Sequence, residues 1–99
     1  MKYKIENDEM IVFLDRELDH HNANITKEQI DSLVMKGNIR TICFDFSDTN
    51  FMDSSGIGII MGRYKLLEAI GGKVYVTNIN KNIERIFLIS GLYKIIERK

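Results

Sequence analysis

The residues with the clearest capacity for chemistry are an aspartate and two serines, Asp53, Ser54 and Ser55, directly before a glycine-containing apolar segment. They follow an apolar run at 41–46 and a short polar loop. This order predicts a helix that begins at the serines, with side-chain oxygens accepting hydrogen bonds from its free backbone N–H groups. Such a helix start presents a serine hydroxyl at a positive helix end, where a phosphate is favoured. A serine modified there would act as a switch.

Two adjacent histidines, His20 and His21, follow Asp19 in an earlier polar segment. A zinc site needs three or four ligands, and the chain has neither a cysteine cluster nor an H-x-x-x-H spacing, so we assign no metal and no cofactor. A nucleophilic hydrolase built on Ser54 with His20 and Asp19 is disfavoured, because the G-x-S-x-G elbow is missing.

The glycines that follow the serines resemble a dinucleotide-binding fingerprint only in part. The third glycine, Gly62, is one residue late, and no Gly-Lys-Ser/Thr phosphate loop is present. The simpler interpretation is packing, since Gly58 and Gly62 lie four residues apart on one helix face and would permit close approach of another backbone. A nucleotide-binding or hydrolysing domain therefore stays only as an alternative class.

Composition sets the broad class of the protein. The chain has 99 residues, 14 basic and 14 acidic, with zero net charge and 44% hydrophobic residues. We expect a single domain over 1–99 with one modest core. Zero net charge gives no argument for a nucleic-acid or membrane partner, and the apolar stretches are too short to span a bilayer. The single cysteine, Cys43, excludes an internal disulfide, is expected in the core, and fits a cytoplasmic location.

Hydrophobic periodicity predicts alternating strands and helices. The expected strands are 3–6 and 10–14, paired as a hairpin, then 41–46, 73–77 and a short closing strand within 93–96. The expected helices begin at Asn22 or Asn24, at Ser54, and at Asn78 or Asn80. This alternation favours an α/β fold with a mostly parallel mixed sheet and helices packed on one face.

The second helix should bury one side and leave another free. Its inner face is expected at Ile57, Ile60, Met61, Tyr64 and Leu67. Ile59 falls off that stripe and is expected in a partly buried contact patch beside Ser54. The loops at 15–21 and 47–53 both follow strands, and open α/β sheets place their sites at such strand ends. We therefore expect 17–21 and 53–55 to be neighbours.

Several segments resemble the STAS family of anti-sigma factor antagonists. They are FMDSSGIG at 51–58, GRYK at 62–65, GGK at 71–73 and SGLYKII at 90–96. The segment ELDHH at 17–21, with Ala23, is similar to the sporulation branch, the antagonists of the anti-sigma-F factor. One departure is Arg16, which stands where the family usually has a glycine and leaves the conformation of that loop open.

The resemblance implies a four- to five-stranded STAS sheet and a role that is not enzymatic. It implies that the unmodified protein binds an anti-sigma factor that is also a serine kinase, and so frees a sporulation sigma factor. That kinase would phosphorylate Ser54, and a serine phosphatase would restore the active form. A stress-response antagonist of the same family is the alternative. The implied partner and switch surface is Asp19, His20, His21, Asp53, Ser54, Ser55, Gly56, Ile57 and Ile59.

Overall fold

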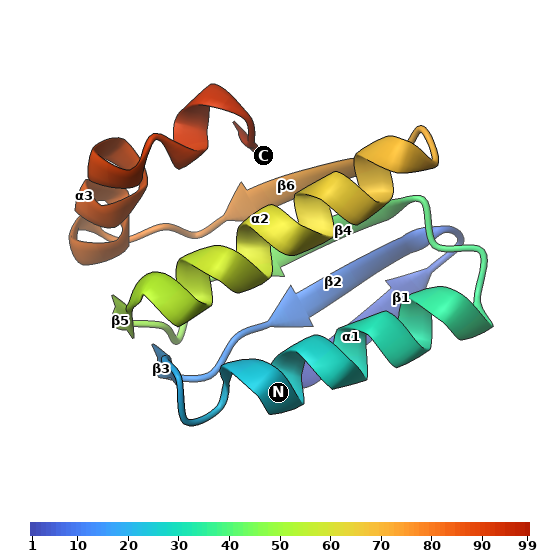
Figure 1. Ribbon diagram of the computed structural model, residues 1–99, viewed down its shortest axis with the longest axis horizontal. Coiled ribbons are helices and arrows are strands. Elements are labelled where there is room, and N and C mark those ends of the chain that lie inside the picture. The colour runs from blue at the N-terminus through green and yellow to red at the C-terminus, as the bar shows by residue number, and fades with distance from the viewer.

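Five strands form the main sheet of the structure, a computed structural model that describes residues 1–99 (Figure 1). The spatial order is β1-β2-β4-β6-β7, with β1 antiparallel to β2 and every other neighbour parallel. The elements are β1 (Lys2–Glu6), β2 (Glu9–Phe13), β3 (Glu17–Leu18), α1 (Ala23–Lys36), β4 (Thr41–Asp45), β5 (Phe51–Met52), α2 (Ser54–Ala69), β6 (Lys73–Thr77), α3 (Lys81–Ser90), a 3-10 turn (Leu92–Lys94) and β7 (Glu97–Arg98). The predicted mostly parallel mixed α/β sheet is confirmed.

The helices α1 and α2 both cover one face of this sheet, in front of β1, β2, β4 and β6 in Figure 1. Each helix joins two parallel strands, so right-handed crossovers bring both to the same side. The predicted hairpin of β1 and β2 is present, and its turn contains Asn7 with a φ of 56°. Asparagine tolerates this left-handed conformation better than most residues do, which explains its place in the turn.

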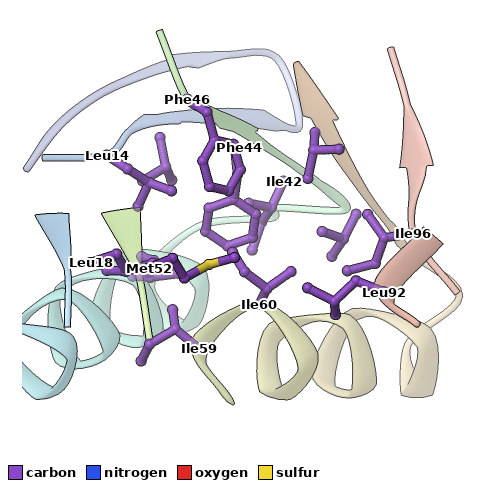
Figure 2. Packing of buried hydrophobic residues seen from close by; sticks show 14 of the residues in the cluster. Leu14, Leu18, Ile42, Phe44, Phe46, Met52, Ile59, Ile60, Leu92 and Ile96 are labelled. Atoms are coloured by element: carbon purple, nitrogen blue, oxygen red, sulfur yellow. The ribbon is translucent and has the colours of Figure 1, made fainter. Parts of the chain in front are cut away.

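The core lies between the sheet and the helices (Figure 2). Phe44, Phe46 and Ile60 are fully buried in it. The ring of Phe46 meets that of Phe87 edge to face, with 5.6 Å between centroids, so the same core extends under α3. Burying one large apolar side chain stabilises a fold by roughly 1.5–3 kcal/mol, and this cluster is therefore the main support of the site described below. Cys43 is buried in its strand, as predicted, and burial raises the pKa of its thiol.

The buried stripe of α2 differs from the predicted one. Met61, expected inside, is exposed, whereas Ile59 is buried with 5% of its surface exposed. Helix α1 packs beside α2, so the side of α2 that faces α1 is buried together with the side that faces the sheet. Arg63 belongs to this face: its Nε lies 3.1 Å from Asp31 Oδ1 of α1. The buried residues of α2 are Gly56, Ile59, Ile60, Arg63 and Leu67.

Two further expectations were wrong. A Cβ added at Gly58 or Gly62 would meet no atom within 4 Å, so neither glycine serves a close backbone approach. The closing strand is not within 93–96. The chain makes a 3-10 turn there, in which Lys94 N–H donates to Gly91 O at 3.0 Å and Ile95 N–H to Leu92 O at 3.1 Å. Leu92 and Ile96 are both buried on its inner side. The short strand β7 follows it.

Candidate functional site

The short parallel pair of β3 and β5 brings together two segments that are distant in the sequence. Glu17 lies opposite Phe51 and Leu18 opposite Met52. Just beyond this pair, Asp53 N–H donates to Leu18 O at 3.2 Å. The expectation that 17–21 and 53–55 are neighbours is confirmed.

A buried threonine, Thr49, holds the two loops that lead into this pair. Its Oγ1 hydroxyl lies 2.7 Å from Asp15 O and 3.3 Å from Leu14 O. Nearby, Asn50 N–H donates to Arg16 O at 2.8 Å. Arg16 does not have a positive φ, so the loop accepts a side chain at this position and does not require the glycine that the resemblance leads us to expect. The role of Thr49 was not predicted, because a threonine in a polar loop cannot be told from any other turn residue by its neighbours.

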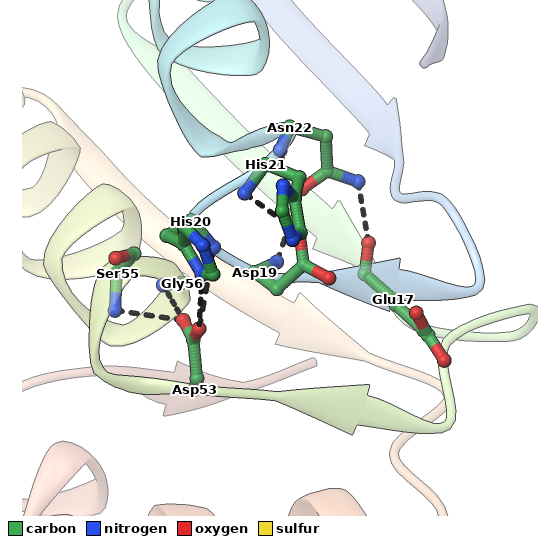
Figure 3. Close-up of polar contacts among 8 residues, drawn as sticks. All are labelled: Glu17, Asp19, His20, His21, Asn22, Asp53, Ser55 and Gly56. Atoms are coloured by element: carbon green, nitrogen blue, oxygen red, sulfur yellow. Dashed lines mark hydrogen bonds and ion pairs between the residues drawn. The ribbon is translucent and has the colours of Figure 1, made fainter.

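Asp53 is the N-cap of α2, where the sequence predicts a cap from the Asp-Ser group without deciding which side chain makes it. Its backbone is extended, and its Oδ1 accepts hydrogen bonds from Ser55 N–H at 2.8 Å and Gly56 N–H at 3.2 Å (Figure 3). These are two of the N–H groups that a helix start leaves without intrahelical partners. The aspartate, and neither serine, therefore closes this helix end.

The second oxygen of Asp53 contacts the other segment. His20 N–H donates to Asp53 Oδ2 at 3.2 Å, and His20 Nδ1 lies 3.7 Å from the same oxygen (Figure 3). Desolvation alone would raise the pKa of Asp53. The backbone hydrogen bonds from Gly56, His20 and Ser55, together with the nearby imidazole, outweigh it and hold that pKa below its ordinary 3.8. Asp53 is therefore a stable anion that joins the two segments.

Asp19 organises the histidine loop. Its Oδ1 accepts from His21 N–H at 3.0 Å and from Asn22 N–H at 3.3 Å. In return, Asn22 Oδ1 accepts from Asp19 N–H at 3.0 Å, so Asn22 stands at the start of α1 without its side chain capping the helix. The rings of His20 and His21 lie 4.0 Å apart between centroids and are exposed. The loop is a compact turn that presents two imidazoles to solvent.

Gly56 is required by the closeness of α2 to β3. A Cβ on this residue would lie 2.5 Å from Leu18 O and 2.5 Å from Met52 Cγ, both impossible contacts. The glycine therefore lets the first turn of α2 sit against the β3 and β5 pair. This contact sets the position of Ser54 and Ser55 relative to the loop that carries His20 and His21.

The two serines differ in exposure. Ser54 is the first residue of α2 and is exposed, whereas Ser55 is half-buried. Two residues expected in the partner surface do not reach it, because Gly56 and Ile59 are both buried. That part of the expected surface is wrong. The residues that do lie together at this end, here called the switch surface, are Asp19, His20, His21, Asp53, Ser54, Ser55 and Ile57.

The switch surface can offer a hydroxyl to another protein. Ser54 stands at a helix N-terminus whose partial positive charge favours an attached anion by about 0.3–1 kcal/mol. A polar hollow adjoins the Asp19 and His21 part of the switch surface. It is lined by Asp15, Arg16, Glu17, Asp19, His21 and Asn22. Within residues 1–99 no group of three or more His, Cys, Asp or Glu side chains is placed to hold a metal ion. No helix here is both long enough and apolar enough to cross a membrane.

Comparisons with known proteins agree with this geometry. A family profile described as "STAS domain" matches residues 1–99. The chain is 40% identical to an "Anti-sigma F factor antagonist" of Paenibacillus polymyxa, over 87% of this chain and 74% of that protein. It is 33% identical to an "Anti-sigma-B factor antagonist" of Bacillus subtilis, over 82% of this chain and 72% of that protein.

Solved structures agree as well. The structure of "the Anti-Sigma Factor Antagonist SpoIIAA in its Unphosphorylated Form" matches with a TM-score of 0.88 and 29% identity, over 99% of this chain and 86% of that one. The structure of "the Bacillus Cell Fate Determinant SpoIIAA in the Phosphorylated Form" matches with a TM-score of 0.79 and 29% identity, over 99% of this chain and 89% of that one.

Proposed function

Because this chain belongs to the STAS domain family, we propose that it acts as an anti-sigma factor antagonist. In this proposal the unmodified chain binds an anti-sigma factor through the switch surface and thereby releases a sporulation sigma factor. The similarity to the Paenibacillus polymyxa antagonist supports this function. The role is one of binding rather than catalysis, and it places the protein in the cytoplasm with its transcription partners.

One observation carries the proposal that Ser54 is the regulated residue. The Ser54 side chain is exposed at the first position of α2, while Asp53 already occupies the backbone N–H groups of Ser55 and Gly56. The Ser54 hydroxyl is therefore free to enter the active site of a serine kinase. In the proposal that kinase is the anti-sigma factor itself, and a serine phosphatase reverses its action.

Phosphorylation would act on binding and spare the fold. A phosphate adds roughly −1.5 to −2 charges at neutral pH. The helix start tolerates it, because Asp53 closes that helix end without help from Ser54. At an interface the same ionised group has to be desolvated, which costs several kcal/mol unless a partner compensates it. About 3 kcal/mol already lowers an affinity roughly a hundredfold.

The solved relatives support this separation of binding from folding. SpoIIAA is known in an unphosphorylated and in a phosphorylated form, and both match this chain over 99% of its length. Both share the fold described above. We infer that a phosphate on Ser54 of this chain likewise leaves the sheet and helices in place.

A kinase assay tests the assignment of Ser54. The chain is incubated with ATP and a purified anti-sigma-F factor, and the modified residue is located by mass spectrometry. We expect phosphate on Ser54, full modification of a Ser55→Ala variant, and none of a Ser54→Ala variant. Phosphate on Ser55, or none on the unaltered chain, would overturn the assignment.

The similarity to the Bacillus subtilis protein favours a second candidate, a stress-response antagonist. The two candidates differ in the partner that is bound. Binding of the chain to purified anti-sigma-F and anti-sigma-B factors would separate them, and we expect the anti-sigma-F factor to bind more tightly. Stronger binding to the anti-sigma-B factor would select the second candidate. Binding of labelled ATP to the isolated chain would instead favour a nucleotide-binding domain.

A further inference from the structure

The strand β1 forms an open edge of the main sheet. It pairs with β2 on one side only, and all five of its residues are exposed. An edge strand presents a row of free backbone N–H and C=O groups, which can pair with another strand. None of the switch surface lies on β1, so this inference does not rest on the proposed function.

The backbone groups that β1 leaves free follow from the bonds of β2. Leu14 N–H donates to Asp45 O, and Asp8 O accepts from Arg40 N–H, so the two residues that flank β2 direct their backbone toward β4. Backbone direction alternates along a strand. The residues Glu9, Ile11 and Phe13 therefore face β1 and meet Glu6, Lys4 and Lys2. This leaves the N–H and C=O groups of Tyr3 and Ile5 pointing outward.

The sequence of β1 is self-complementary in an antiparallel pair. When two copies of Lys2-Tyr3-Lys4-Ile5-Glu6 are aligned about Lys4, Lys2 of one copy lies opposite Glu6 of the other. In the same register Tyr3 lies opposite Ile5, and their outward backbone groups form the hydrogen-bonded pairs. We propose that β1 pairs with β1 of a second copy of this chain, joining two five-stranded sheets across a twofold axis.

The charges on one side of this pair combine one repulsion with two attractions. In this register Lys4 lies directly opposite Lys4 of the second copy, and like charges at such a position oppose the pairing of edge strands. Here Lys4 Nζ already lies 2.7 Å from Glu6 Oε1 of its own strand. In the dimer each Glu6 would lie between that Lys4 and Lys2 of the second copy. Both ends of the pair thereby place opposite charges across from each other, which stabilises antiparallel strands.

The other side of the pair is apolar. Tyr3 and Ile5 face the helix-covered side, since they pair with Val12 and Met10, which are fully buried. Yet Tyr3 is 49% and Ile5 44% exposed. A groove between β1 and α1 continues this surface and is lined in part by Met1, Tyr3, Ile25 and Leu33. A second copy would cover the exposed apolar residues and supply the same ones in return.

Sedimentation velocity over a range of concentrations tests the proposal. The chain should sediment as a monomer of 11.5 kDa when dilute and shift toward twice that mass when concentrated. Lys2→Glu and Glu6→Lys each place like charges opposite each other at both ends, and each should weaken dimerisation about tenfold or more. The double variant restores opposite charges and should restore dimerisation.

Circular dichroism and thermal melting of each variant separate a lost dimer from a lost fold. Ser54→Ala is the matched control and should dimerise like the unaltered chain. A monomer at every concentration would overturn the proposal. So would single charge variants that dimerise unchanged, or a folded double variant that fails to recover. A dimer lost in Ser54→Ala would place the contact at the switch surface instead.

Discussion

Asp53 and His20 contact each other twice across 33 positions of sequence: His20 N–H donates to Asp53 Oδ2 at 3.2 Å, and His20 Nδ1 lies 3.7 Å from the same oxygen. The other oxygen of Asp53 caps α2 through Ser55 N–H and Gly56 N–H. One carboxylate thus holds both halves of the switch surface. The position of Ser54 relative to the histidine loop depends on it.

Substitutions of Asp53 should separate its two functions. Asp53→Ser keeps an N-cap oxygen but shortens the side chain, so it should retain most of the melting temperature while releasing His20. Asp53→Ala removes both contacts and should lower the melting temperature by several degrees. Hydrogen exchange of the His20 amide reports on the loop, and thermal melting reports on the cap. Unchanged His20 exchange in both variants would contradict a tether through Asp53.

The cap should also be sensitive to acid. The pKa of Asp53 is lowered in the folded chain, so its charged form contributes stability above the unfolded value and loses it as the pH falls through the folded one. The contribution is therefore complete at neutral pH, begins to fall near the ordinary pKa of 3.8 and is lost only below the lower pKa of the folded chain. The melting temperature of the unaltered chain should exceed that of Asp53→Asn near neutral pH, and the gap should close in acid. A constant gap would rule out this ionisation as its source.

Two glycines of α2 should respond in opposite ways to alanine. At Gly56 the new Cβ would overlap Leu18 O and Met52 Cγ, and such overpacking typically costs about 1–3 kcal/mol. Gly58 is exposed with no atom near its Cβ position, so Gly58→Ala should gain up to about 1 kcal/mol from helix propensity. Urea denaturation of both variants measures the difference. Equal effects would mean that α2 does not approach β3 as described.

The ion pair between α1 and α2 gives a further prediction. Arg63 is buried with 5% of its surface exposed, and Asp31 is its anionic partner at 3.1 Å. Asp31→Ala leaves an uncompensated buried cation and should cost about 2 kcal/mol, less than for a fully buried pair because Asp31 is partly exposed. Arg63→Met, which removes the buried charge and keeps its volume, should cost less. The opposite order in chemical denaturation would contradict this account of the pair.

The sequence predicts most of this fold because turns and periodicity are local signals. A capped helix start within 53–55 and the strand at β4 follow from neighbouring residues alone. The meeting of 17–21 with 53–55 follows from one further rule, that loops after parallel strands share an edge.

What the sequence did not predict depends on contacts between elements. Ile57, Ile59, Ile60 and Met61 are all apolar, so periodicity could not decide which side of α2 faces inward. The packing of α1 beside α2 buries Ile59 and Arg63, and Asp31 of α1 supplies the charge that pairs with Arg63. The hydrogen bond from His20 N–H to the distant carboxylate of Asp53 likewise has no local signal.

The affinity of the chain for an anti-sigma-F factor, with and without a phosphate on Ser54, tests the central claim most directly. Isothermal titration calorimetry should show binding by the unmodified chain and by Ser54→Ala. The phosphorylated chain should bind at least about a hundredfold more weakly at an unchanged melting temperature. Equal affinity of the two forms, or a phosphorylated chain that unfolds, would contradict the account.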